Sequence, residues 1–546
     1  MEEILAIDFG TTNSVVFAYA KNEVKQIWNN QNSGDYLFPS FVDYTDKGVV
    51  VGNAAKLFIG KKGHFVVTCV KRLIGKAYDE YLKLEKKDIF GCDVVRGDDG
   101  YPYFVVSEDA TKKVSCIDVA CELFKWIKAS AETICKRTFT KAYVTKPANY
   151  LDNQVKAIRE AARRAGLKID KMINEPTAAG LSWCVETKEK SPGKLKPEDK
   201  ILVVDFGGGT LDFSVIRYLG NDIFNVEDNS GNPNLGGNDI DYALMQLILD
   251  RLKNNFGVDI EKKIMKKWRL AKIRNVCEEQ KINVNSETKD ADFYERFLQL
   301  NESLVFEFDV ADFLSSSDDL PEPTIMIPFR EVTEAYMNCL KNAIKPLRAI
   351  IDKPGQRLDE ISYVLLVGGS SRLMAFHQLL YREGLKRTKF VAIDPMTCVA
   401  RGAYELSKIY NDPTNKVKMT EKIAISYGLK SGDNKVVLLL KKGMKIPATS
   451  EGVKFINTND EPARIEIMAY QCVEDEGKYE VDIEKCSLIK AWQFENPLKF
   501  RQPKGEQLLE LQFELHVGGT LQVTCKDVAR NKLLLDEETN VIYENQ

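Results

Sequence analysis

Hydrophobic and polar positions along the chain follow two periods, and the period changes near residue 420. Before that point, short apolar runs alternate with stretches in which apolar residues recur every three or four positions, as in amphipathic helices. This pattern predicts helices over residues 118–136, 152–165 and 239–256, the second with Asp152 as its N-cap residue. Strands mixed with helices indicate α/β lobes.

One strand–turn–strand pattern occurs twice, about 200 residues apart. In each copy an apolar strand ends in Asp (Asp8, Asp205), a Gly/Thr-rich turn follows, and a second alternating strand comes after it. Each copy predicts a β-hairpin. Two matched copies indicate a duplication, so we expect lobe I over about residues 1–200 and lobe II over about 201–395 of a domain that spans 1–410.

Beyond residue 422 the period is two. Alternating apolar residues predict strands over 436–440, 463–470, 508–516 and 521–525, with Gly518-Gly519 turning between the last two. Residues 423–546 are therefore expected to form a small β-rich domain without a helical segment after it, and the polar segment 411–422 is expected to be the linker before it. Charged or proline-containing stretches at 188–200 and 315–323 predict loops.

Composition narrows the class of protein. The chain has 546 residues, enough for two to four domains, and its 77 Lys+Arg nearly balance its 80 Asp+Glu. A net charge of −3 gives no strong field toward nucleic acid or an anionic membrane. The start has no signal-peptide pattern, and no apolar stretch reaches 18 residues, so we expect a cytoplasmic protein without a membrane partner.

Cysteine and histidine do not form a recognisable site. The twelve Cys are scattered without a Cys-x-x-Cys pair, and the three His lie far apart. We therefore expect reduced thiols, with neither a zinc site nor a disulfide framework.

The two hairpins carry the chemistry. Glycine-rich turns let backbone N–H groups approach phosphate oxygens, because no Cβ stands in the way. Thr11, Thr12 and Thr210 add hydroxyl groups at the same turns. If a pseudo-twofold relates the lobes, Asp8 and Asp205 face one another, and a pair of carboxylates suits Mg²⁺, which keeps most of its water ligands.

Two other interpretations of these motifs fail. Asp-Phe-Gly occurs in protein kinases, but those need a His-Arg-Asp upstream, which is absent here. Gly207-Gly208-Gly209 precedes an alternating, strand-like segment instead of opening a helix, so a dinucleotide-binding fold is disfavoured.

Six segments, in order along the chain, resemble the signature segments of heat-shock protein 70 (DnaK-type) chaperones. They are Asp8-Phe-Gly-Thr-Thr-Asn-Ser, Val70-Lys-Arg-Leu-Ile-Gly75, Asn174-Glu-Pro-Thr-Ala-Ala179, Asp205-Phe-Gly-Gly-Gly-Thr-Leu-Asp212, Leu235-Gly-Gly-Asn-Asp239 and Val367-Gly-Gly-Ser-Ser-Arg372. The match covers residues 1–410 well and 423–546 more loosely. It implies the α/β class, with a duplicated actin-like two-lobed ATPase domain and then a β-sandwich domain, in a short member without the C-terminal helical lid.

The resemblance also implies roles for single residues. Asp8 and Asp205 hold hydrated Mg²⁺, Lys71 positions the attacking water, Glu175 senses the γ-phosphate and Asp212 holds a metal or potassium ion. The implied catalytic residues are Lys71, Glu175, Asp205, Asp8 and Thr210. The implied contacts to ATP or ADP are Gly10, Thr11, Thr12, Asn13, Gly207, Gly208, Gly209, Thr210, Gly236, Gly237, Glu278, Lys281, Asn285, Gly368, Gly369, Ser370, Arg372 and Asp394.

The chain departs from the family pattern in several places. Ile282 stands where a second arginine packs on adenine, and Val155 stands where an arginine partners the interlobe proline, Pro147. The linker lacks its usual leucines, so its docking as an added strand is expected to differ. In the β-domain, Gly432 replaces an arch methionine. The peptide-binding residues implied are Leu429, Phe455, Ile465 and Ile467.

Three functions remain open from the sequence. The preferred one is an ATP-hydrolysing chaperone that binds unfolded polypeptides and works with a nucleotide-exchange factor and a J-domain co-chaperone, the latter near Lys171 and Asn174. The second is a non-folding adaptor of the ribosome-associated type, in which ATP stabilises closed lobes. The third is a small-molecule kinase with actin-like lobes, against which Asn174-Glu-Pro-Thr-Ala-Ala179 and the trailing β-domain argue.

Overall fold

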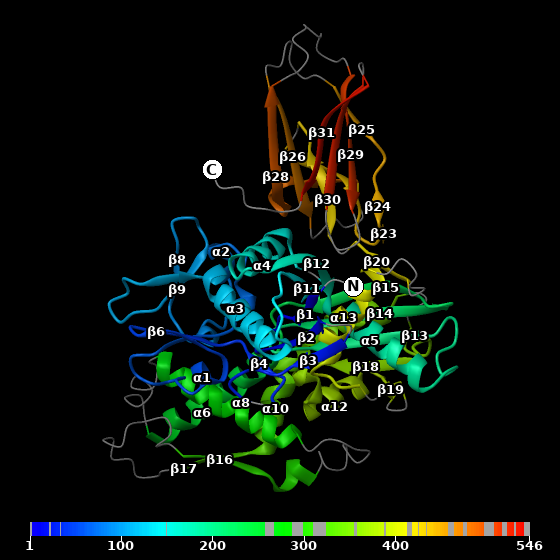
Figure 1. Ribbon diagram of the computed structural model, residues 1–546. Helices are drawn as coiled ribbons and strands as arrows, with labels where there is room; N and C mark the ends of the chain where they lie inside the picture. The colour runs from blue at the N-terminus through cyan, green and yellow to red at the C-terminus, as the bar shows by residue number, and fades with distance from the viewer. Residues whose placement is uncertain are drawn as a thin grey trace.

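The computed structural model describes residues 3–539, except for 21–22, 33, 149, 257–266, 287–298, 310–323, 354–356, 387–388, 392, 412–417, 424, 433, 457–463, 473–477, 496–506, 516–520 and 529–530. Figure 1 shows two α/β lobes side by side and a β-sandwich standing above them. The α/β class and the two-lobed architecture predicted from the sequence are confirmed.

The lobe I sheet is built around the first predicted hairpin. Its strand order is β12-β11-β1-β2-β3, with β4 paired to β2. The strands are β1 (Ile4–Asp8), β2 (Asn13–Ala20), β3 (Glu23–Ile27), β4 (Phe38–Pro39), β11 (Lys141–Lys146) and β12 (Lys168–Asn174). Strand β1 is apolar on both faces because Leu5 and Ile7 enter one hydrophobic core while Ile4 and Ala6 enter another.

The lobe II sheet repeats this arrangement. Its order begins β19-β18-β13-β14-β15, where β13 pairs in parallel with β18 and antiparallel with β14, as β1 does with β11 and β2. The strands are β13 (Lys200–Phe206), β14 (Leu211–Gly220), β15 (Ile223–Asn232), β18 (Tyr363–Val367) and β19 (Phe390–Val391). The duplication predicted from the two hairpins is therefore confirmed.

Two helices pack between the sheets and form a shared core. They are α5 (Glu175–Lys190) and α13 (Cys398–Asn411), whose apolar residues join those of β1, β2, β13 and β14. The helices touch closely at Gly402, where an added Cβ would lie 1.7 Å from the carbonyl oxygen of Ala178. This close contact fixes the two lobes around the ends of β1 and β13.

The remaining elements cover the outer faces of the sheets. In lobe I they are β5 (Val42–Thr45), β6 (Gly48–Val51), α1 (Gly52–Lys56), β7 (Phe65–Val67), the 3-10 helix η1 (Val70–Arg72), α2 (Tyr78–Leu82), β8 (Val94–Arg96), β9 (Pro102–Val105), β10 (Lys113–Ser115), α3 (Cys116–Cys135) and α4 (Asp152–Arg164). In lobe II they are α6 (Gly237–Phe256), α8 (Lys267–Ser286), β16 (Val305–Asp309), β17 (Thr324–Pro328), α10 (Phe329–Leu340), α11 (Ile344–Ile351) and α12 (Met374–Arg382).

The three predicted helices are present, but their ends differ. Helices α3 and α6 each begin two residues earlier than predicted, at Cys116 and Gly237. Helix α4 begins one position earlier than predicted, with Leu151 as its N-cap residue, and Asp152 is its first helical residue. Leu151 has the extended backbone of the N-cap position, and the carboxylate of Asp152 pairs instead with Lys156, four residues later, at 2.9 Å. The predicted loop 188–200 is also shorter, since α5 continues to Lys190. The predicted loop 315–323 lies outside the described residues.

The β-sandwich consists of two sheets around one core. One sheet has the order β27 (Glu480–Asp482), β22 (Lys435–Leu440), β21 (Ser426–Lys430), β26 (Arg464–Cys472) and β28 (Cys486–Glu495). The other contains β24 (Ala448–Thr449), β25 (Val453–Ile456), β29 (Gln507–Leu515), β30 (Leu521–Asp527) and β31 (Lys532–Thr539). The four strands predicted here are confirmed; the predicted Gly518-Gly519 turn lies outside the described residues.

The end of the linker docks on lobe II as a strand. Strand β20 (Lys418–Lys422) pairs in parallel with β15, with Lys418 opposite Ile223, and then antiparallel with β23 (Lys445–Ile446). The segment docks as an added strand although it lacks the leucines, because backbone groups make the ladder. Thr420 also donates from its hydroxyl to Asn225 Oδ1 at 2.7 Å.

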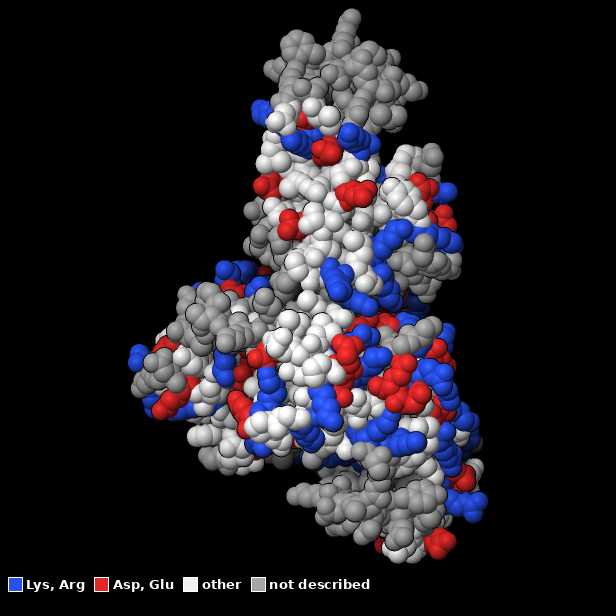
Figure 2. All heavy atoms as spheres, turned by 90° about the vertical axis from the view of Figure 1, so that its right-hand side faces the viewer, with Lys and Arg blue, Asp and Glu red and all other residues white. Residues whose placement is uncertain are grey.

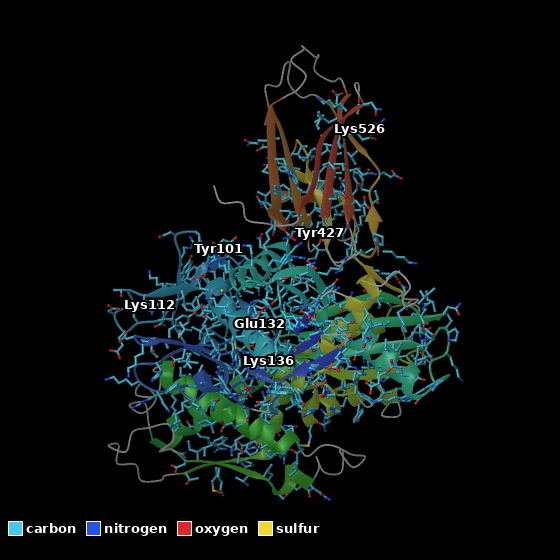
Figure 3. All side chains as sticks on the ribbon, in the orientation of Figure 1. Tyr101, Lys112, Glu132, Lys136, Tyr427 and Lys526 are labelled. Carbon is cyan, nitrogen blue, oxygen red and sulfur yellow. A yellow bond between two sulfur atoms is a disulfide. The ribbon has the colours of Figure 1, made fainter. Side chains whose placement is uncertain are left out.

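The sandwich also contacts helix α4 of lobe I. The backbone N–H of Asp152 donates to Gln471 Oε1 at 3.0 Å, and Lys156 Nζ donates to the carbonyl of Ile489 at 2.8 Å. Tyr427 lies at the base of the sandwich in Figure 3, and burial and the Asp152 carboxylate raise its pKa. The α/β lobes and the β-domain are therefore joined at α4 as well as at β20.

One disulfide contradicts the prediction that all thiols are reduced. Cys472 and Cys486 stand directly opposite one another in the β26–β28 ladder, with Cα atoms 4.5 Å apart, and their sulfurs are bonded. Such a cross-strand pair has the spacing that a disulfide requires. Their separation of 14 residues in the sequence does not indicate a disulfide, because only the register of β26 and β28 brings the two cysteines together.

Surface charge is mixed in sign. Figure 2 shows basic and acidic side chains intermingled over the lobes on the face turned to the viewer, so their fields largely cancel there. Among the helices of the described residues, none combines the length and the apolar character that a membrane crossing requires.

Replacing both disulfide cysteines, Cys472→Ser/Cys486→Ser, should lower the free energy of opening strands β26 and β28 by about 3 kcal/mol, because a closed loop of this size restricts the unfolded chain. Hydrogen exchange of the amides in these strands measures the change. Reductant should have the same effect on the wild type and none on the double variant. Equal exchange in the oxidised wild type and the variant would show that the bond contributes nothing.

Candidate functional site

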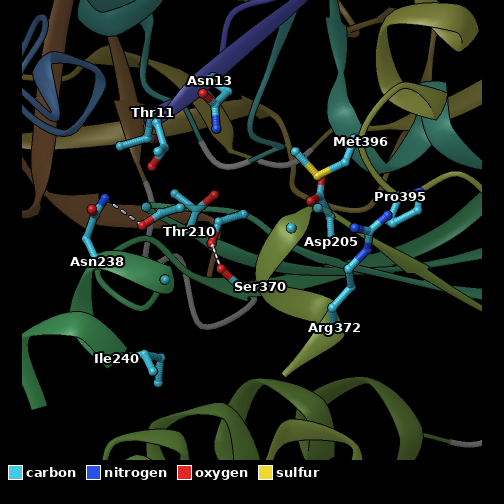
Figure 4. A pocket seen from close by; sticks show the side chains of 18 of the residues that line it. Thr11, Asn13, Asp205, Thr210, Asn238, Ile240, Ser370, Arg372, Pro395 and Met396 are labelled. Carbon is cyan, nitrogen blue, oxygen red and sulfur yellow. Dashed lines mark hydrogen bonds between the residues drawn. The ribbon is translucent and has the colours of Figure 1, made fainter. Parts of the chain in front are cut away.

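A cavity of about 300 Å³ lies between the lobes, at the ends of strands β1 and β13. Both hairpin turns line it. Figure 4 shows Thr11 and Asn13 of lobe I on one side and Asn238 and Ser370 of lobe II on the other. Ser370 Oγ donates to the carbonyl of Gly207, and Asn238 Nδ2 donates to the carbonyl of Gly208, each at 2.8 Å.

The two turns approach so closely that only glycine fits at their contact. A Cβ at Gly208 would lie 2.0 Å from Thr12 Oγ1, and one at Gly209 would lie 2.5 Å from Thr11 Oγ1. At Gly10 a Cβ would lie 1.8 Å from the carbonyl oxygen of Asn13. The turns therefore present backbone groups and threonine hydroxyls to the cavity with no side chain between them, as an oxyanion site requires.

Buried carboxylates gather behind the turns. Thr145 Oγ1 donates to Asp8 Oδ1 at 2.8 Å, and Asp205 and Asp212 are directly opposite in the β13–β14 ladder. Burial and Glu175 raise the pKa of Asp8 to about 6 and that of Asp212 to about 7. Burial, with Glu175, Asp212 and Asp8, holds the pKa of Asp205 well above its usual range. Such a cluster is unfavourable unless a cation compensates it.

A lysine–glutamate pair faces this cluster. Lys71 Nζ is 2.6 Å from Glu175 Oε1, and both side chains are buried, at 4% and 9% exposed. Lys71 comes from η1 and Glu175 from the first turn of α5, where the helix dipole favours a carboxylate. Tyr150 Oη donates to the backbone carbonyl of Lys71 at 2.8 Å and fixes its position.

The carboxylates fit a hydrated Mg²⁺. Within the described parts of the chain, no group of three or more His, Cys, Asp or Glu is placed to enclose a metal. Mg²⁺ does not need such a cage, because it binds through one or two carboxylates and keeps its waters. Asp8 and Asp205 both line the cavity, and Asp212 Oδ2 is buried with no hydrogen-bond partner in the described structure. A hard cation would relieve this excess of negative charge.

A buried arginine bridges the lobes beside the turns. The Arg72 guanidinium donates to the carbonyl of Gly209 at 2.7 Å and is paired with the carboxylate of Asp239. Lys86 Nζ binds the same carboxylate at 2.9 Å. Burial raises the pKa of Asp239, but Arg72 and Lys86 outweigh burial and hold it below its usual value. The contact fastens the lobe II turn to lobe I.

Helix α8 forms the far wall of the cavity. Lys281 Nζ binds Asp241 Oδ1 at 2.7 Å and the carbonyl of Gly237 at 3.1 Å. Glu278 is paired across the lobes with Lys56 at 2.8 Å. Asn285 Oδ1 accepts from the backbone N–H of Met374 at 2.8 Å and joins α8 to α12. These contacts hold the polar side chains of Glu278, Lys281 and Asn285, all on α8, at the wall of the cavity.

Arg372 and Ile282 stand at the open end of the cavity. Figure 4 shows the Arg372 side chain extended toward Pro395. Ile282 lines the cavity and is 51% exposed. The guanidinium plane and the apolar side chain offer two surfaces of the kind on which a flat base packs.

Most of the residues predicted from the sequence meet at this cavity. Those that line it are Asp8, Gly10, Thr11, Thr12, Asn13, Lys71, Glu175, Asp205, Gly207, Gly208, Gly209, Thr210, Gly237, Glu278, Lys281, Asn285, Gly368, Gly369, Ser370 and Arg372.

Three predicted residues lie outside the lining. Gly236 packs against Gly208, and its N–H donates to Asp239 Oδ2 at 2.8 Å. Asp394 is exposed and accepts from the N–H of Met396 at 3.1 Å. Asp212 lies behind Asp205 in the hairpin. These residues shape the turns around the cavity.

The sequence reasoning missed four residues of the site. Arg72 and Asp239 bridge the lobes, Asn238 holds the second turn, and Asp241 anchors Lys281. Arg72, Asn238 and Asp239 belong to motifs that the sequence analysis singled out. Their positions next to Lys71 and Gly237 were the available signal, but Arg72 and Asp239 are 167 residues apart in the sequence, and Asn238 is 30 residues from Gly208.

Two of the predicted peptide-binding residues are in the sandwich core. Leu429 and Ile467 are 2% and 5% exposed, within one cluster of both sheets, so neither is open to a peptide in this structure. The side chains of Phe455 and Ile465 lie outside the described residues; their backbones belong to β25 and β26. Gly432 is exposed, with open space where a Cβ would be.

The chain is similar to known proteins over most of its length. A family model described as Hsp70 protein matches residues 4–541. The mitochondrial heat shock 70 kDa protein of Dictyostelium discoideum is 28% identical over 533 residues, which cover 97% of this chain and 74% of the relative. The cytoplasmic location expected from the sequence is contradicted by this comparison, because that relative is a mitochondrial protein.

Asp212→Asn should stabilise the protein at pH 8 in the presence of EDTA, by roughly 1–4 kcal/mol, because it removes one buried carboxylate from the cluster. The native Asp212 carboxyl has a pKa of about 7 and its ordinary value is 3.8. Between these pH values the native protein binds a proton that the unfolded chain does not, so wild-type stability rises as the pH falls and the advantage of the variant shrinks.

Urea denaturation at pH 8 and at pH 5 measures this difference. Asp359→Asn, whose side chain is 71% exposed, serves as the control and should change stability little at either pH. If Asp212→Asn is no more stable than the wild type at pH 8, the buried charge of Asp212 does not destabilise the folded protein.

Proposed function

The chain belongs to the heat-shock protein 70 family, whose members are nucleotide-binding ATPases and chaperones, and on that premise we propose that it is an ATP-dependent molecular chaperone. In this proposal it binds ATP with Mg²⁺ in the interlobe cavity and hydrolyses it to ADP and phosphate. Binding and hydrolysis are coupled to the binding of unfolded polypeptide segments.

The observation that carries the proposal is the buried Lys71–Glu175 pair, which faces Asp8 and Asp205 between two glycine turns. An ion pair that served only stability would not be placed beside Asp8, Asp205 and Asp212, because three more buried carboxylates add a desolvation cost. The arrangement supports phosphoryl transfer, in which a protein contributes mainly positioning and charge stabilisation.

Each part of the cavity has a role in this proposal. The N–H groups of the two turns and the hydroxyls of Thr11 and Thr210 hold the phosphates. Asp8 and Asp205 hold hydrated Mg²⁺, which when bound neutralises charge on the β- and γ-phosphate oxygens. Glu278 and Lys281 contact the ribose and the base, which packs against Arg372.

Lys71 is suited to orient the attacking water. Its ammonium has three N–H donors, and Glu175 Oε1 accepts one of them. The other two can hold a water molecule in line with the γ-phosphate and stabilise the charge that develops there. Glu175 keeps the ammonium in place and, through α5, connects it to the shared core.

One segment links the phosphate site to the β-domain. Thr145 binds Asp8, Tyr150 binds the carbonyl of Lys71, and Asp152 at the start of α4 binds Gln471 of the sandwich. A shift of the carboxylates or of Lys71 on nucleotide binding would move this segment and the docked sandwich together. This supports coupling between nucleotide and polypeptide, although Val155 stands where the family has an arginine.

The proposal includes partners by analogy with the family. A J-domain co-chaperone would bind near Lys171 and Asn174, both on β12 and thus next to Glu175. A nucleotide-exchange factor would act on the interlobe contacts, such as Lys56–Glu278.

One observation favours a second function, an ATP-stabilised adaptor. Leu429 and Ile467 are packed in the sandwich core and the sandwich is docked on α4 and β15. A β-domain held in this way serves as a fixed surface for a protein partner. In that case nucleotide keeps the lobes closed and hydrolysis is incidental.

Lys71→Met should reduce ATP turnover at least about a hundredfold while nucleotide binding is retained, because the variant loses the group that orients water and keeps the turns that hold the phosphates. Single-turnover hydrolysis and calorimetry measure the two properties. Lys62→Met, an exposed lysine of the same lobe, is the control. Since Lys71→Met leaves Glu175 unpaired, Lys71→Met/Glu175→Gln restores neutrality and should remain inactive. Unchanged turnover in both variants contradicts the role given to Lys71.

Steady-state ATPase activity with an unfolded peptide separates the chaperone from the adaptor. The chaperone predicts severalfold stimulation by peptide, because peptide binding disturbs the docked sandwich and the segment that reaches Lys71. Asp152→Pro, which removes the N–H that Gln471 accepts, should weaken the stimulation and leave basal turnover. Turnover that no peptide changes supports the adaptor.

A further inference from the structure

The disulfide of the β-domain lies beside the contact between the sandwich and lobe I. Cys472 is the last residue of β26 and Cys486 is the first of β28, and the two stand opposite one another in the ladder. The residue before Cys472 is Gln471, whose Oε1 accepts from the backbone N–H of Asp152. The disulfide and this contact with α4 are therefore adjacent on one strand.

A bulge in β28 separates a short end of the ladder from the rest. At the shift in register β28 has one residue more than β26, and this extra residue is Ile489. Its carbonyl accepts from Lys156 Nζ at 2.8 Å, which is the second contact between the sandwich and α4. Beyond Ile489 only three pairs of residues remain, and the last is Cys472 with Cys486.

This short end of β28 lies at the margin of the sheet. β28 is the edge strand, next to β26 (Figure 1). The end beyond the bulge is therefore held in the sheet by three pairs on β26 and by the disulfide. Edge pairs beside a bulge open more readily than pairs inside a sheet, because the ladder is interrupted there. The disulfide is thus what makes this end firm.

One sulfur of the bond is more accessible than the other. Cys472 is fully buried in a small apolar cluster with Val436 and Leu438, whereas Cys486 is half-buried. A thiolate from solution would therefore attack the sulfur of Cys486 and displace Cys472. After reduction the carbonyl of Asp482, 3.6 Å from Cys486 Sγ, can accept from the released thiol.

We propose that Cys472–Cys486 is a thiol-exchange site, through which a dithiol reductant controls how firmly the β-domain is docked on α4. In the oxidised chain the bond fixes the end of β28 on β26, and both contacts with α4 are kept. In the reduced chain this end opens, the Lys156 contact is lost with it, and docking depends on Gln471 and on β20. The proposal goes beyond the proposed function, because it concerns the docking of the β-domain and not the nucleotide.

The exchange is balanced between the two partners. The first thiolate of the dithiol forms a bond to the Cys486 sulfur, the Cys472–Cys486 bond breaks, and Cys472 takes up a proton. The second thiolate then attacks the sulfur that the dithiol has bound to Cys486, closes the dithiol's own disulfide and releases Cys486, which also takes up a proton. The dithiol gives up two electrons and two protons, and the two cysteines gain them.

The test follows the backbone amide of Asp152 by hydrogen exchange in the full chain, oxidised and after treatment with dithiothreitol. Alkylation of free thiols and peptide mapping show whether the bond has opened. In the reduced chain the Asp152 amide should exchange on the order of tenfold faster, because the sandwich leaves α4 more often. The amides of β30, in the other sheet, should keep their rates. Each comparison is made without nucleotide and with Mg²⁺–ATP.

Four variants separate the steps. Cys472→Ala/Cys486→Ala should exchange as the reduced wild type does, with or without dithiothreitol. Cys525→Ala, which removes a buried free cysteine of β30, should respond to dithiothreitol as the wild type does. Gln471→Met removes the acceptor of the Asp152 N–H and gives the rate of the undocked chain in both redox states. In Lys156→Met the redox effect should fall to about twofold or less, because the contact that reduction opens is already absent.

Several results would overturn the proposal. They are a bond that dithiothreitol opens only in urea, an Asp152 amide with equal rates in both redox states with and without nucleotide, and a full redox effect in Lys156→Met. Faster exchange in β30 as well would also overturn it, because the bond would then hold the whole sandwich together and not its docking. Failure to bind nucleotide would refute the proposed function and leave these readouts unchanged.

Discussion

The structure depends on several carboxylates that are buried close together between the two lobes. Their positions at the ends of strands and of helix α5 keep them there. Asp205 and Asp212 are opposite one another in a ladder, and Asp8 and Glu175 reach the same region from the other lobe. Like charges at this spacing repel, and burial disfavours their ionised forms. A protein keeps such an arrangement where a cation or an electrophile is to be held. The positively charged side chains around the site offset the repulsion between the carboxylates.

The compensating groups come from lobe I, whereas two of the carboxylates come from lobe II. Lys71 binds Glu175, Arg72 binds Asp239 and the carbonyl of Gly209, and Lys56 binds Glu278. Each of these contacts crosses between segments that are distant in sequence, and two of them cross between the lobes. The ion pairs Arg72–Asp239 and Lys56–Glu278 therefore hold the two lobes together beside the cavity.

A short segment of lobe I connects the carboxylates and Lys71 to the β-domain. Residues 145–152 contact Asp8, Asn174, the carbonyl of Lys71 and Gln471 in turn. The sandwich is thus attached at two points with different chemistry, a backbone ladder at β20 and side-chain contacts at α4. The Cys472–Cys486 bond lies next to Gln471 and stiffens the strands that make the α4 contact.

The sequence by itself determined the duplicated hairpins, the positions of Asp8 and Asp205 at strand ends, the α/β class of the lobes and the strands of the β-domain. These features follow from hydrophobic period and turn chemistry, which act between residues close in sequence. Only the tertiary structure decided that Arg72 pairs with Asp239, that Lys146 binds Asn174, that Cys472 meets Cys486 and that the linker joins β15 without its leucines. These contacts depend on strand register and on the approach of the lobes. The sequence around each partner does not predict these contacts, because the residues next to it are the same whether or not the other partner is close in space.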